Sequence, residues 1–226
     1  MAEGCFVAGT DTGIGKTHAS VALLEALRAR GFRAVGMKPV ASGCEATREG
    51  LRNADAAALI EASDPKPEYA LCNPFALPDP IAPHLAARAA GVEIATAPIL
   101  NAYARLAATA DRVVVEGVGG WAVPFSDTLM QADLVRALDL PVILVVGMRL
   151  GCLNHALLSV RAIRADGATL RGWIANRVDP EMMAAEGNLA TLQARIDAPL
   201  LGVLDHAPRA RPAETAHALA DAVARW

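Results

Sequence analysis

The stretch that decides the fold of this chain is Gly9-Thr10-Asp11-Thr12-Gly13-Ile14-Gly15-Lys16-Thr17. A short apolar run over residues 4–8 precedes it and a helical pattern over residues 16–30 follows it, so we expect a strand, a glycine-rich loop and a helix. Backbone N–H groups at such a helix start bind anions, the lysine reaches the outer phosphates of a nucleotide, and the next hydroxyl can ligate Mg²⁺. The sequence therefore predicts a nucleotide phosphate site in this loop.

The loop departs from the strict phosphate-loop pattern G-x-x-x-x-G-K-[ST] at its first glycine. The pattern places glycine at position 10, where this chain has Thr10, and the nearest glycine is Gly9. A plain glycine-rich turn is the alternative interpretation. Because a Gly-Lys-Thr triplet lies between a predicted strand and a predicted helix, the pattern favours phosphate binding.

Short apolar runs alternate with longer Ala/Leu-rich stretches along the rest of the chain, which is typical of repeated βαβ units. We therefore expect an α/β fold, in one domain over residues 1–226, with a doubly wound, mostly parallel sheet flanked by helices. The expected strands are residues 4–8, 34–37, 112–115, 142–146, 171–175 and 200–204. The expected helices are residues 16–30, 52–62, 83–90, 96–109, 129–138, 153–166, 181–196 and 213–224. The Pro-rich stretch 64–83 is either an ordered loop beside a pocket or a plain surface loop.

Composition excludes several classes of function. The chain has 21 basic and 24 acidic residues and only 4% aromatics, which argues against a nucleic-acid binder. The longest aliphatic run, residues 141–148, falls far short of the roughly 20 residues of a membrane span. No signal-peptide pattern is present, so we expect a cytoplasmic protein. The cysteines lack metal or disulfide spacing, and we interpret Cys5 and Cys72 as reduced structural residues.

Two carboxylates and a lysine are candidates for the rest of a magnesium nucleotide site. Glu116 follows a predicted strand and precedes Gly117-Val118-Gly119-Gly120, at the sheet edge where ligands bind. Asp55 lies at the start of a predicted helix, where an acidic residue is as often mere dipole compensation as a metal ligand. Lys38 ends another predicted strand and either holds a second anion or is a surface lysine.

Two further polar positions each have two interpretations. Asn176 ends a predicted strand and either reads the edge of a base, since an amide both donates and accepts, or caps a turn. The segment Leu150-Gly151-Cys152-Leu153-Asn154-His155 joins a strand to a helix. That helix start either binds a substrate carboxylate or is simply capped by Asn154, with His155 packed beneath it.

Together these segments resemble the dethiobiotin synthetase family, whose members close a ureido ring at the expense of ATP in biotin synthesis. The resemblance runs in family order from residue 6 to residue 202. The segments that carry it are Gly9-Thr10-Asp11-Thr12 with Gly15-Lys16-Thr17, Gly36-Met37-Lys38-Pro39-Val40-Ala41-Ser42-Gly43, Leu51-Arg52-Asn53-Ala54-Asp55, Pro80-Ile81-Ala82-Pro83-His84, Val115-Glu116-Gly117-Val118-Gly119-Gly120-Trp121, residues 141–147 and residues 150–155.

The resemblance implies a reaction and its participants. The substrate would be 7,8-diaminononanoate, whose amine takes up CO₂, supplied as bicarbonate, to form a carbamate. ATP, the co-substrate, would phosphorylate the carbamate, and the second amine would close the ring with release of phosphate. The family further implies Mg²⁺ as cofactor, a homodimer with the substrate site at the subunit interface, and no nucleic-acid or membrane partner.

The resemblance also assigns roles to residues of this chain. The catalytic residues would be Thr12, Lys16 and Lys38, and the metal ligands Thr17, Asp55 and Glu116. The substrate would contact Lys38, Ser42, Pro80, Leu150, Gly151, Cys152 and Asn154. The nucleotide would contact Gly13, Ile14, Gly15, Lys16, Thr17, His18, Asp55, Glu116, Gly117, Val118, Gly119, Asn176, Arg177, Asp205, His206, Ala207 and Glu214.

The chain departs from the family pattern in its C-terminal part. The family usually has an Ile-Pro or Leu-Pro step at the nucleotide base, and here Asp205 replaces the proline. Asn188 stands where some members have a tyrosine near the substrate carboxylate. The run Asn176-Arg177-Val178-Asp179 also matches the N-x-x-D base reader of GTPases. We expect ATP, with base selectivity left open.

Two other function classes remain alternatives on the same fold. A dimeric partition- or division-site ATPase switch would bind a macromolecular partner, but those proteins usually carry an extra lysine early in the phosphate loop. Here no lysine precedes Lys16. A non-catalytic nucleotide-binding module is disfavoured by Lys38 and Ser42 beside the expected metal ligands.

Overall fold

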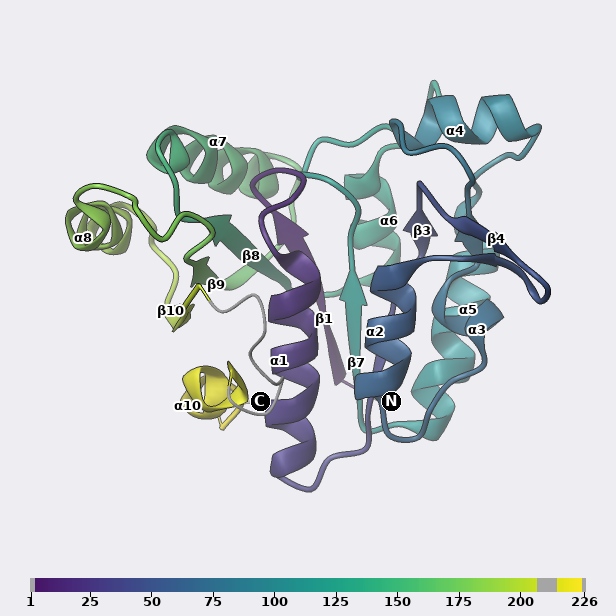
Figure 1. The fold of residues 1–226 in the computed structure, drawn as a ribbon, viewed down its shortest axis with the longest axis horizontal. Helices are drawn as coiled ribbons and strands as arrows, with labels where there is room; N and C mark the ends of the chain where they lie inside the picture. Colours follow the sequence, from purple (N-terminus) through teal and green to yellow (C-terminus); the bar gives the residue numbers. More distant parts are fainter. Residues whose placement is uncertain (1–2, 207–214, 225–226) are drawn as a thin grey trace.

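A parallel sheet forms the centre of the protein (Figure 1). The structure, a computed structural model, describes residues 3–206 and 215–224, and within them the main sheet has six strands in the order β10-β9-β8-β1-β7-β2. Every neighbouring pair in it is parallel. The strands are β1 (Glu3–Gly9), β2 (Ala34–Met37), β7 (Arg112–Glu116), β8 (Val142–Gly147), β9 (Leu170–Asn176) and β10 (Leu200–Leu204). The doubly wound fold predicted from the sequence is confirmed.

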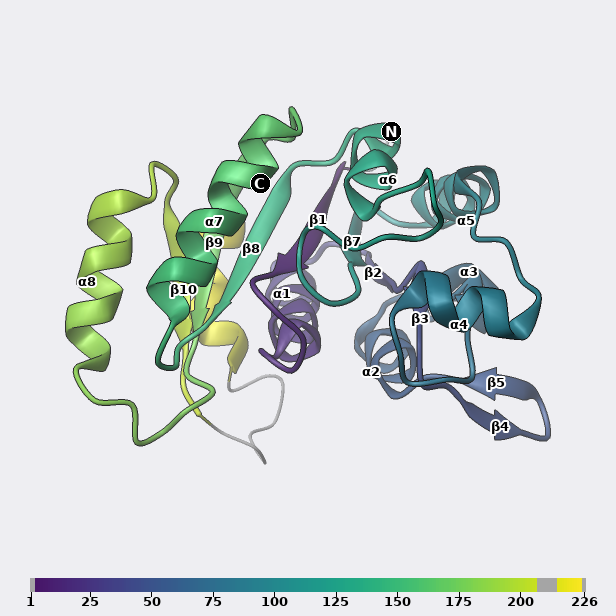
Figure 2. The same ribbon diagram turned by 90° about the horizontal axis from the view of Figure 1, so that it is seen from above.

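Helices cover both faces of the sheet, as Figure 2 shows from above. One face carries α1 (Lys16–Ala29), α2 (Ala54–Ala62) and the 3-10 helix η1 (His217–Leu219) with α10 (Ala220–Val223). The other face carries α5 (Thr96–Thr109), α6 (Gln131–Leu138), α7 (Cys152–Ala165) and α8 (Ala185–Arg195). The helix α4 (Pro83–Ala90) lies beyond the carboxyl edge of the sheet, on the β2 side (Figure 1 and Figure 2). Among the helices of the described residues, none combines the length and the hydropathy needed to cross a bilayer.

The central strands place their side chains alternately in two cores. In β1, Cys5 and Val7 pack toward α1, whereas Phe6 and Ala8 pack toward the opposite helix layer, and all four are fully buried. The sequences of parallel strands that are covered on both faces are continuously apolar, without alternation of apolar and polar residues. This is why the strand signals in the sequence are short and uniformly hydrophobic.

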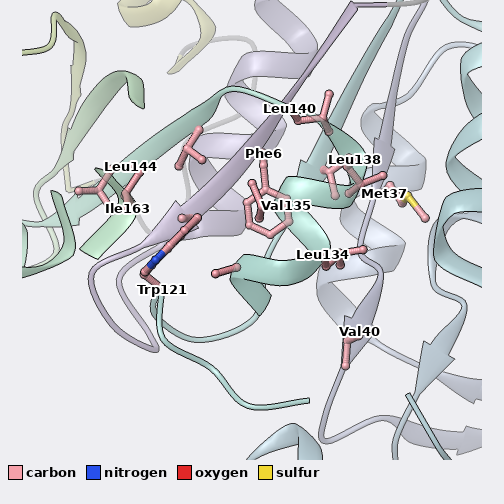
Figure 3. Packing of buried hydrophobic residues seen from close by; sticks show 14 of the residues in the cluster. Phe6, Met37, Val40, Trp121, Leu134, Val135, Leu138, Leu140, Leu144 and Ile163 are labelled. Atoms are coloured by element: carbon pink, nitrogen blue, oxygen red, sulfur yellow. The ribbon is translucent and has the colours of Figure 1, made fainter. Parts of the chain in front are cut away.

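The loop after β7 is anchored in the core by Trp121, which is 3% exposed. Figure 3 shows its ring in the cluster that contains Phe6, Leu144 and Ile163. Its Nε1 donates a hydrogen bond of 2.7 Å to Oδ2 of Asp166, at the end of α7. Burial of a large apolar side chain stabilises a fold by about 1.5–3 kcal/mol. The loop that follows β7 is therefore held in place at Trp121.

Several predicted helix boundaries were wrong by a few residues. The helix expected over residues 52–62 begins at Ala54, because the Asn53 side chain caps it there. The helix expected over residues 181–196 begins at Ala185, where the left-handed φ of 53° at Ala184 interrupts the regular backbone. The helix expected over residues 129–138 begins at Gln131. Of the helix expected over residues 213–224, the described part consists of helical residues 215–216, then η1 and α10.

Several short elements of the structure were not predicted from the sequence. These are the parallel pair β3 (Val40–Ala41) and β6 (Phe75–Ala76), the hairpin β4 (Glu45–Thr47) and β5 (Gly50–Arg52), and the helical turn α3 (Tyr69–Cys72). Each has only two to four residues, too few for a hydrophobic period to be recognised. The Pro-rich stretch 64–83 contains α3 and β6, so it is an ordered segment.

All four cysteines are free thiols, and two of them should be chemically inert in the folded protein. Burial raises the pKa of both Cys5 and Cys72 to about 12. Because only the thiolate reacts, almost none of either thiol is reactive at pH 8. We expect Ellman's reagent to leave both residues unmodified in the native protein and to label them once urea unfolds the chain. Peptide mapping by mass spectrometry assigns the sites, and rapid native labelling of either cysteine would contradict the burial.

Candidate functional site

Three adjacent strands bring the candidate residues together at the carboxyl edge of the sheet. The phosphate loop follows β1, Glu116 is the last residue of β7, and Lys38 follows β2. In the parallel register Met37 pairs with Val115, so the next residues, Lys38 and Glu116, leave the sheet side by side. Sheet register therefore makes these two side chains meet.

Lys38 is the centre of a buried ionic cluster. Its Nζ lies 2.6 Å from Oε1 of Glu116 and 3.0 Å from Oδ2 of Asp55. Thr17 Oγ1 donates a 2.9 Å hydrogen bond to the same Glu116 oxygen. Lys38 is 3% exposed and Glu116 is fully buried. Such a pair persists only with good geometry and additional hydrogen bonds, and Lys38 also donates to the carbonyl of Gly117 at 3.2 Å.

Charge pairing keeps Lys38 and Asp55 ionised. Burial works against the charge of Lys38, but Glu116 and Asp55 outweigh it and raise the pKa of Lys38. Burial also disfavours the Asp55 carboxylate, yet the Lys38 charge outweighs it and lowers the pKa of Asp55. For Lys16, burial together with repulsion from Lys38 lowers the pKa to about 8. Asp55 thus does more than compensate a helix dipole, because its carboxylate pairs with Lys38.

The phosphate loop folds tightly over its own lysine. Lys16 Nζ donates to the carbonyl of Asp11 at 3.1 Å, and the Asp11 side chain pairs with Arg149 at 2.5 Å. A Cβ at Gly9 would lie 3.0 Å from Cδ of Lys16 and 3.1 Å from the Asp11 carbonyl oxygen. The close approach of the lysine stem favours glycine at position 9 of this variant loop.

A glutamine organises the loop after β7. It was not among the site residues predicted from the sequence. Gln131, fully buried at the start of α6, accepts a 2.8 Å hydrogen bond from Val118 N and donates one of 2.7 Å to the Gly120 carbonyl. Its sequence context resembles an ordinary polar helix start. Only the tertiary structure reveals that it shapes the loop.

These elements enclose a cleft of about 850 Å³. The phosphate loop, the Lys38–Ser42 segment, the loop after β7 and the end of the Pro-rich stretch line it. Ser42 Oγ is buried and has no hydrogen-bond partner among the described residues. The predicted site residues that line the cleft are Thr12, Gly13, Gly15, Lys16, Thr17, Lys38, Ser42, Asp55, Pro80, Glu116, Val118 and Gly119.

Several predicted nucleotide contacts lie outside the lining of this cleft. The Ile14 side chain is buried in the α1 core, His18 is half-buried on α1, and Gly117 N donates to the Val7 carbonyl. Asp205 and His206 are exposed. Ala207 and Glu214 lie outside the described residues.

The two residues that end β9 and follow it have local partners. Asn176 Nδ2 donates to the Ile14 carbonyl at 2.8 Å, so this amide group holds the phosphate loop rather than capping a turn. Arg177 pairs with Glu186 and lies 3.4 Å from Asp205. The Asp205 that replaces the family's proline therefore has a cationic neighbour.

The segment 150–155, at the start of α7, is not part of the described lining of the cleft. Leu150 is 96% exposed, and Asn154 and His155 are exposed too, whereas Cys152 is buried. The helix is capped by Gly151 at φ 95° without a side-chain hydrogen bond, so the interpretation of Asn154 as a cap with His155 packed beneath was wrong.

The side chains around Lys38 suit Mg²⁺. Thr17, Asp55 and Glu116 supply oxygen atoms, the donor type that Mg²⁺ prefers, alongside phosphate oxygens and water. Glu116 Oε2 is buried and lacks a hydrogen-bond partner in the described part of the chain. Within the same residues, no group of three or more His, Cys, Asp or Glu is placed to hold a metal. The donor set fits an ion that takes few protein ligands.

Solved structures establish the kind of fold. The MinC:MinD cell division protein complex of Aquifex aeolicus superposes with a TM-score of 0.58 at 13% identity, covering 99% of this chain and 95% of that chain. MinD complexed with Mg-ADP from Pyrococcus horikoshii OT3 gives 0.56 at 15% identity, covering 99% and 96%. At such low identity these likenesses show the fold alone.

Sequence comparison goes further. A family model described as an AAA domain matches residues 3–214. ATP-dependent dethiobiotin synthetase from Xanthomonas euvesicatoria pv. vesicatoria (strain 85-10) is 61% identical over 214 residues, 95% of this chain and 96% of that protein. The chain belongs to the dethiobiotin synthetase family. A second member, from Xylella fastidiosa (strain 9a5c), is 60% identical over 203 residues, 90% of each chain. The family resemblance stated from the motifs is confirmed.

Within this dethiobiotin synthetase fold, Gly15 should be far less replaceable than Gly13. Both have positive φ, 80° and 72°, where an L-residue costs roughly 1–2 kcal/mol. A Cβ at Gly13 would meet nothing within 4 Å, whereas one at Gly15 would lie 2.1 Å from Asn176 Nδ2. Gly15→Ala should therefore lower the free energy of unfolding by about 1–3 kcal/mol more than Gly13→Ala, because it also breaks the Asn176 hydrogen bond. Urea unfolding followed by circular dichroism measures both, and equal losses would contradict the close approach.

Proposed function

We propose that this protein closes the ureido ring of dethiobiotin from 7,8-diaminononanoate, CO₂ and ATP. The observation that carries the proposal is the buried Lys38 cluster facing the phosphate loop across one cleft, in a chain of the dethiobiotin synthetase family.

In the proposed reaction, three bonds form in turn. An amine nitrogen adds to CO₂ and loses a proton, giving a carbamate. A carbamate oxygen attacks the γ-phosphorus and releases ADP. The second amine then attacks the carbonyl carbon, expels phosphate and closes the ring.

Charge repulsion is the main obstacle to this chemistry, because a carbamate must approach a triphosphate. Lys16 and Lys38 both line the cleft, and their charges would offset that repulsion. Thr12 and Ser42 line the same cleft and would hydrogen-bond the carbamate or the transferred phosphoryl group. The unpartnered Ser42 hydroxyl supports that role. Positioning of two anions against two lysines then supplies much of the catalysis.

Thr17, Asp55 and Glu116 would hold Mg²⁺. When bound, Mg²⁺ neutralises negative charge on the β- and γ-phosphates. The buried Glu116 oxygen without a hydrogen-bond partner and the ionised Asp55 support this assignment.

The base of the nucleotide would lie toward the ends of β9 and β10. We assign its contacts to Asn176, the last residue of β9, and to Arg177, Asp205 and His206, which follow these strands at the ligand-binding edge of the sheet. Ile14 and Gly117 would contribute from the loops that hold the phosphates, and His18 from the first turn of α1. Ala207 and Glu214 belong to the same proposal but lie outside the described residues.

We propose a homodimer in which the segment Leu150-Gly151-Cys152-Leu153-Asn154 serves the partner's site. This segment does not line the cleft of its own protomer, and Leu150 and, further along α7, Leu158 expose 96% and 53% of their surface. No side chain caps the start of α7, whose N-cap is Gly151, so backbone N–H groups of its first turn would bind a substrate carboxylate.

We further propose that residues 1–226 act as one domain in the cytoplasm. Four free cysteines fit a reducing compartment. Nothing in the chemistry requires nucleic acid or a membrane.

A coupled assay tests the reaction. ADP formation should require both 7,8-diaminononanoate and bicarbonate, and mass spectrometry should identify dethiobiotin as product in equal amount. The physical reason is that no acceptor for the γ-phosphoryl group exists until the carbamate has formed. ATP hydrolysis that is indifferent to the diamine would refute the proposal and favour a nucleotide-dependent switch.

Two lysine variants sharpen this assay. Lys38→Ala should lower turnover by about a hundredfold or more, because it removes a charge aimed at the transition state, while nucleotide binding by calorimetry persists. It also leaves Glu116 buried without its ion pair, so circular dichroism must first establish folding. Lys66→Ala is the matched control, since Lys66 is an exposed lysine paired with Glu61. Normal turnover of Lys38→Ala would overturn its role.

The shared site predicts complementation between two defective variants. Asn154→Asp places a carboxylate against the substrate carboxylate and should raise KM for the diamine, while Lys38→Ala lacks turnover. Co-expression of the two should yield mixed dimers with one intact site, and about a quarter of wild-type activity on random pairing of a two-fold dimer. No gain above the separate variants would show that the segment does not serve the partner.

A further inference from the structure

A ring of hydrogen bonds closes around Lys38 behind the cleft. Two of its members, Tyr69 and Asn73, have no role in the mechanism above. Tyr69 Oη accepts a 2.7 Å hydrogen bond from Asn53 N and donates one of 3.0 Å to Asn73 Oδ1. Asn73 Nδ2 in turn donates to the carbonyl oxygen of Lys38 at 2.7 Å. The α3 segment thus reaches the backbone of the catalytic lysine.

Asn53 continues the ring to Asp55. Its Oδ1 accepts hydrogen bonds from the backbone N–H groups of Asp55, at 3.0 Å, and Ala56, at 3.2 Å, and so caps α2. Asp55 Oδ2 returns to Lys38 Nζ at 3.0 Å. Lys38 is therefore fixed at both ends, its carbonyl by Asn73 and its ammonium group by Asp55, and Tyr69 joins the two.

The ring is built to be rigid. Asn73 is 3% exposed and donates to a second carbonyl, that of Phe75, at 3.3 Å. Lys38 N donates to the Cys72 carbonyl at 2.7 Å, which ties the residue after β2 to α3 a second time. The Arg52 guanidinium carbon lies 4.2 Å from the centre of the Tyr69 ring and restrains it. Buried polar networks whose members are satisfied fix a single geometry.

We propose that Tyr69 and Asn73 are positioning residues that set the place of Lys38 relative to Asp55 for phosphoryl transfer. Neither side chain belongs to the described lining of the cleft, so both act through Lys38 and Asp55 rather than on substrate. Displacements of about 1 Å are enough to cost large factors in rate when catalysis depends on orientation. The proposal rests on the proposed function, because it concerns the transfer step of that reaction.

Tyr69→Phe is the decisive variant, because it removes one oxygen and keeps the ring under Arg52. We expect kcat for dethiobiotin formation to fall about tenfold, equivalent to about 1.4 kcal/mol of transition-state stabilisation, with KM for the diamine unchanged within about twofold. The matched control is Tyr103→Phe. Tyr103 is partly buried on α5, and its hydroxyl lies beside Gly4 at the amino end of β1, away from the cleft. The control should keep wild-type kcat.

A second variant tests whether the two residues act as one unit. Asn73→Ala should also lower kcat, and Tyr69→Phe should add little to it, because both break the same connection. Additive losses, or a wild-type kcat in Tyr69→Phe, would overturn the proposal. So would a fall in Tm with unchanged kcat per folded molecule, since that marks a purely structural role. If the wild-type protein itself makes no dethiobiotin, the proposed function fails instead.

Discussion

The buried ion pair between Lys38 and Glu116 is the interaction on which the site depends. A lysine 3% exposed beside a fully buried glutamate is costly to remove from water, and it is retained only because both partners have further hydrogen bonds. The register of β2 against β7 brings the two together, and the two-faced packing of those strands keeps the register from slipping. The same strand packing therefore sets both the stability of the fold and the geometry of the site.

Residues from other elements surround this ion pair and complete the cleft. Asp55 and Thr17 join it from the starts of α2 and α1, and the loop after β7 is shaped by Gln131 and anchored by Trp121. Each contributing segment is therefore held by something other than the site itself. Such support is what lets charged groups keep a fixed arrangement before any ligand binds.

Much of the fold and part of the site could be predicted from local sequence. The glycine-rich loop between strand and helix, and the polar residues that follow apolar runs, already place Lys16, Lys38 and Glu116 at one sheet edge. Other features depend on contacts between distant segments. Nothing near Gln131 in the sequence marks it as a loop organiser, and the Asn176 amide could not be assigned to the Ile14 carbonyl without the tertiary structure. The helix α2 begins later than predicted because the side-chain cap at Asn53, and not the hydrophobic period, sets its first residue.

The placement of lysine has a practical consequence for chemical modification. Only three of the 21 basic residues are lysines, and two of them, Lys16 and Lys38, are 7% and 3% exposed. Lys66 has a side chain 57% exposed, on the surface. Guanidinium groups do not react with acylating reagents under mild conditions, because they stay protonated. Amine-directed coupling of a dye or a solid support therefore has one accessible lysine side chain, and its attachment leaves the cleft untouched.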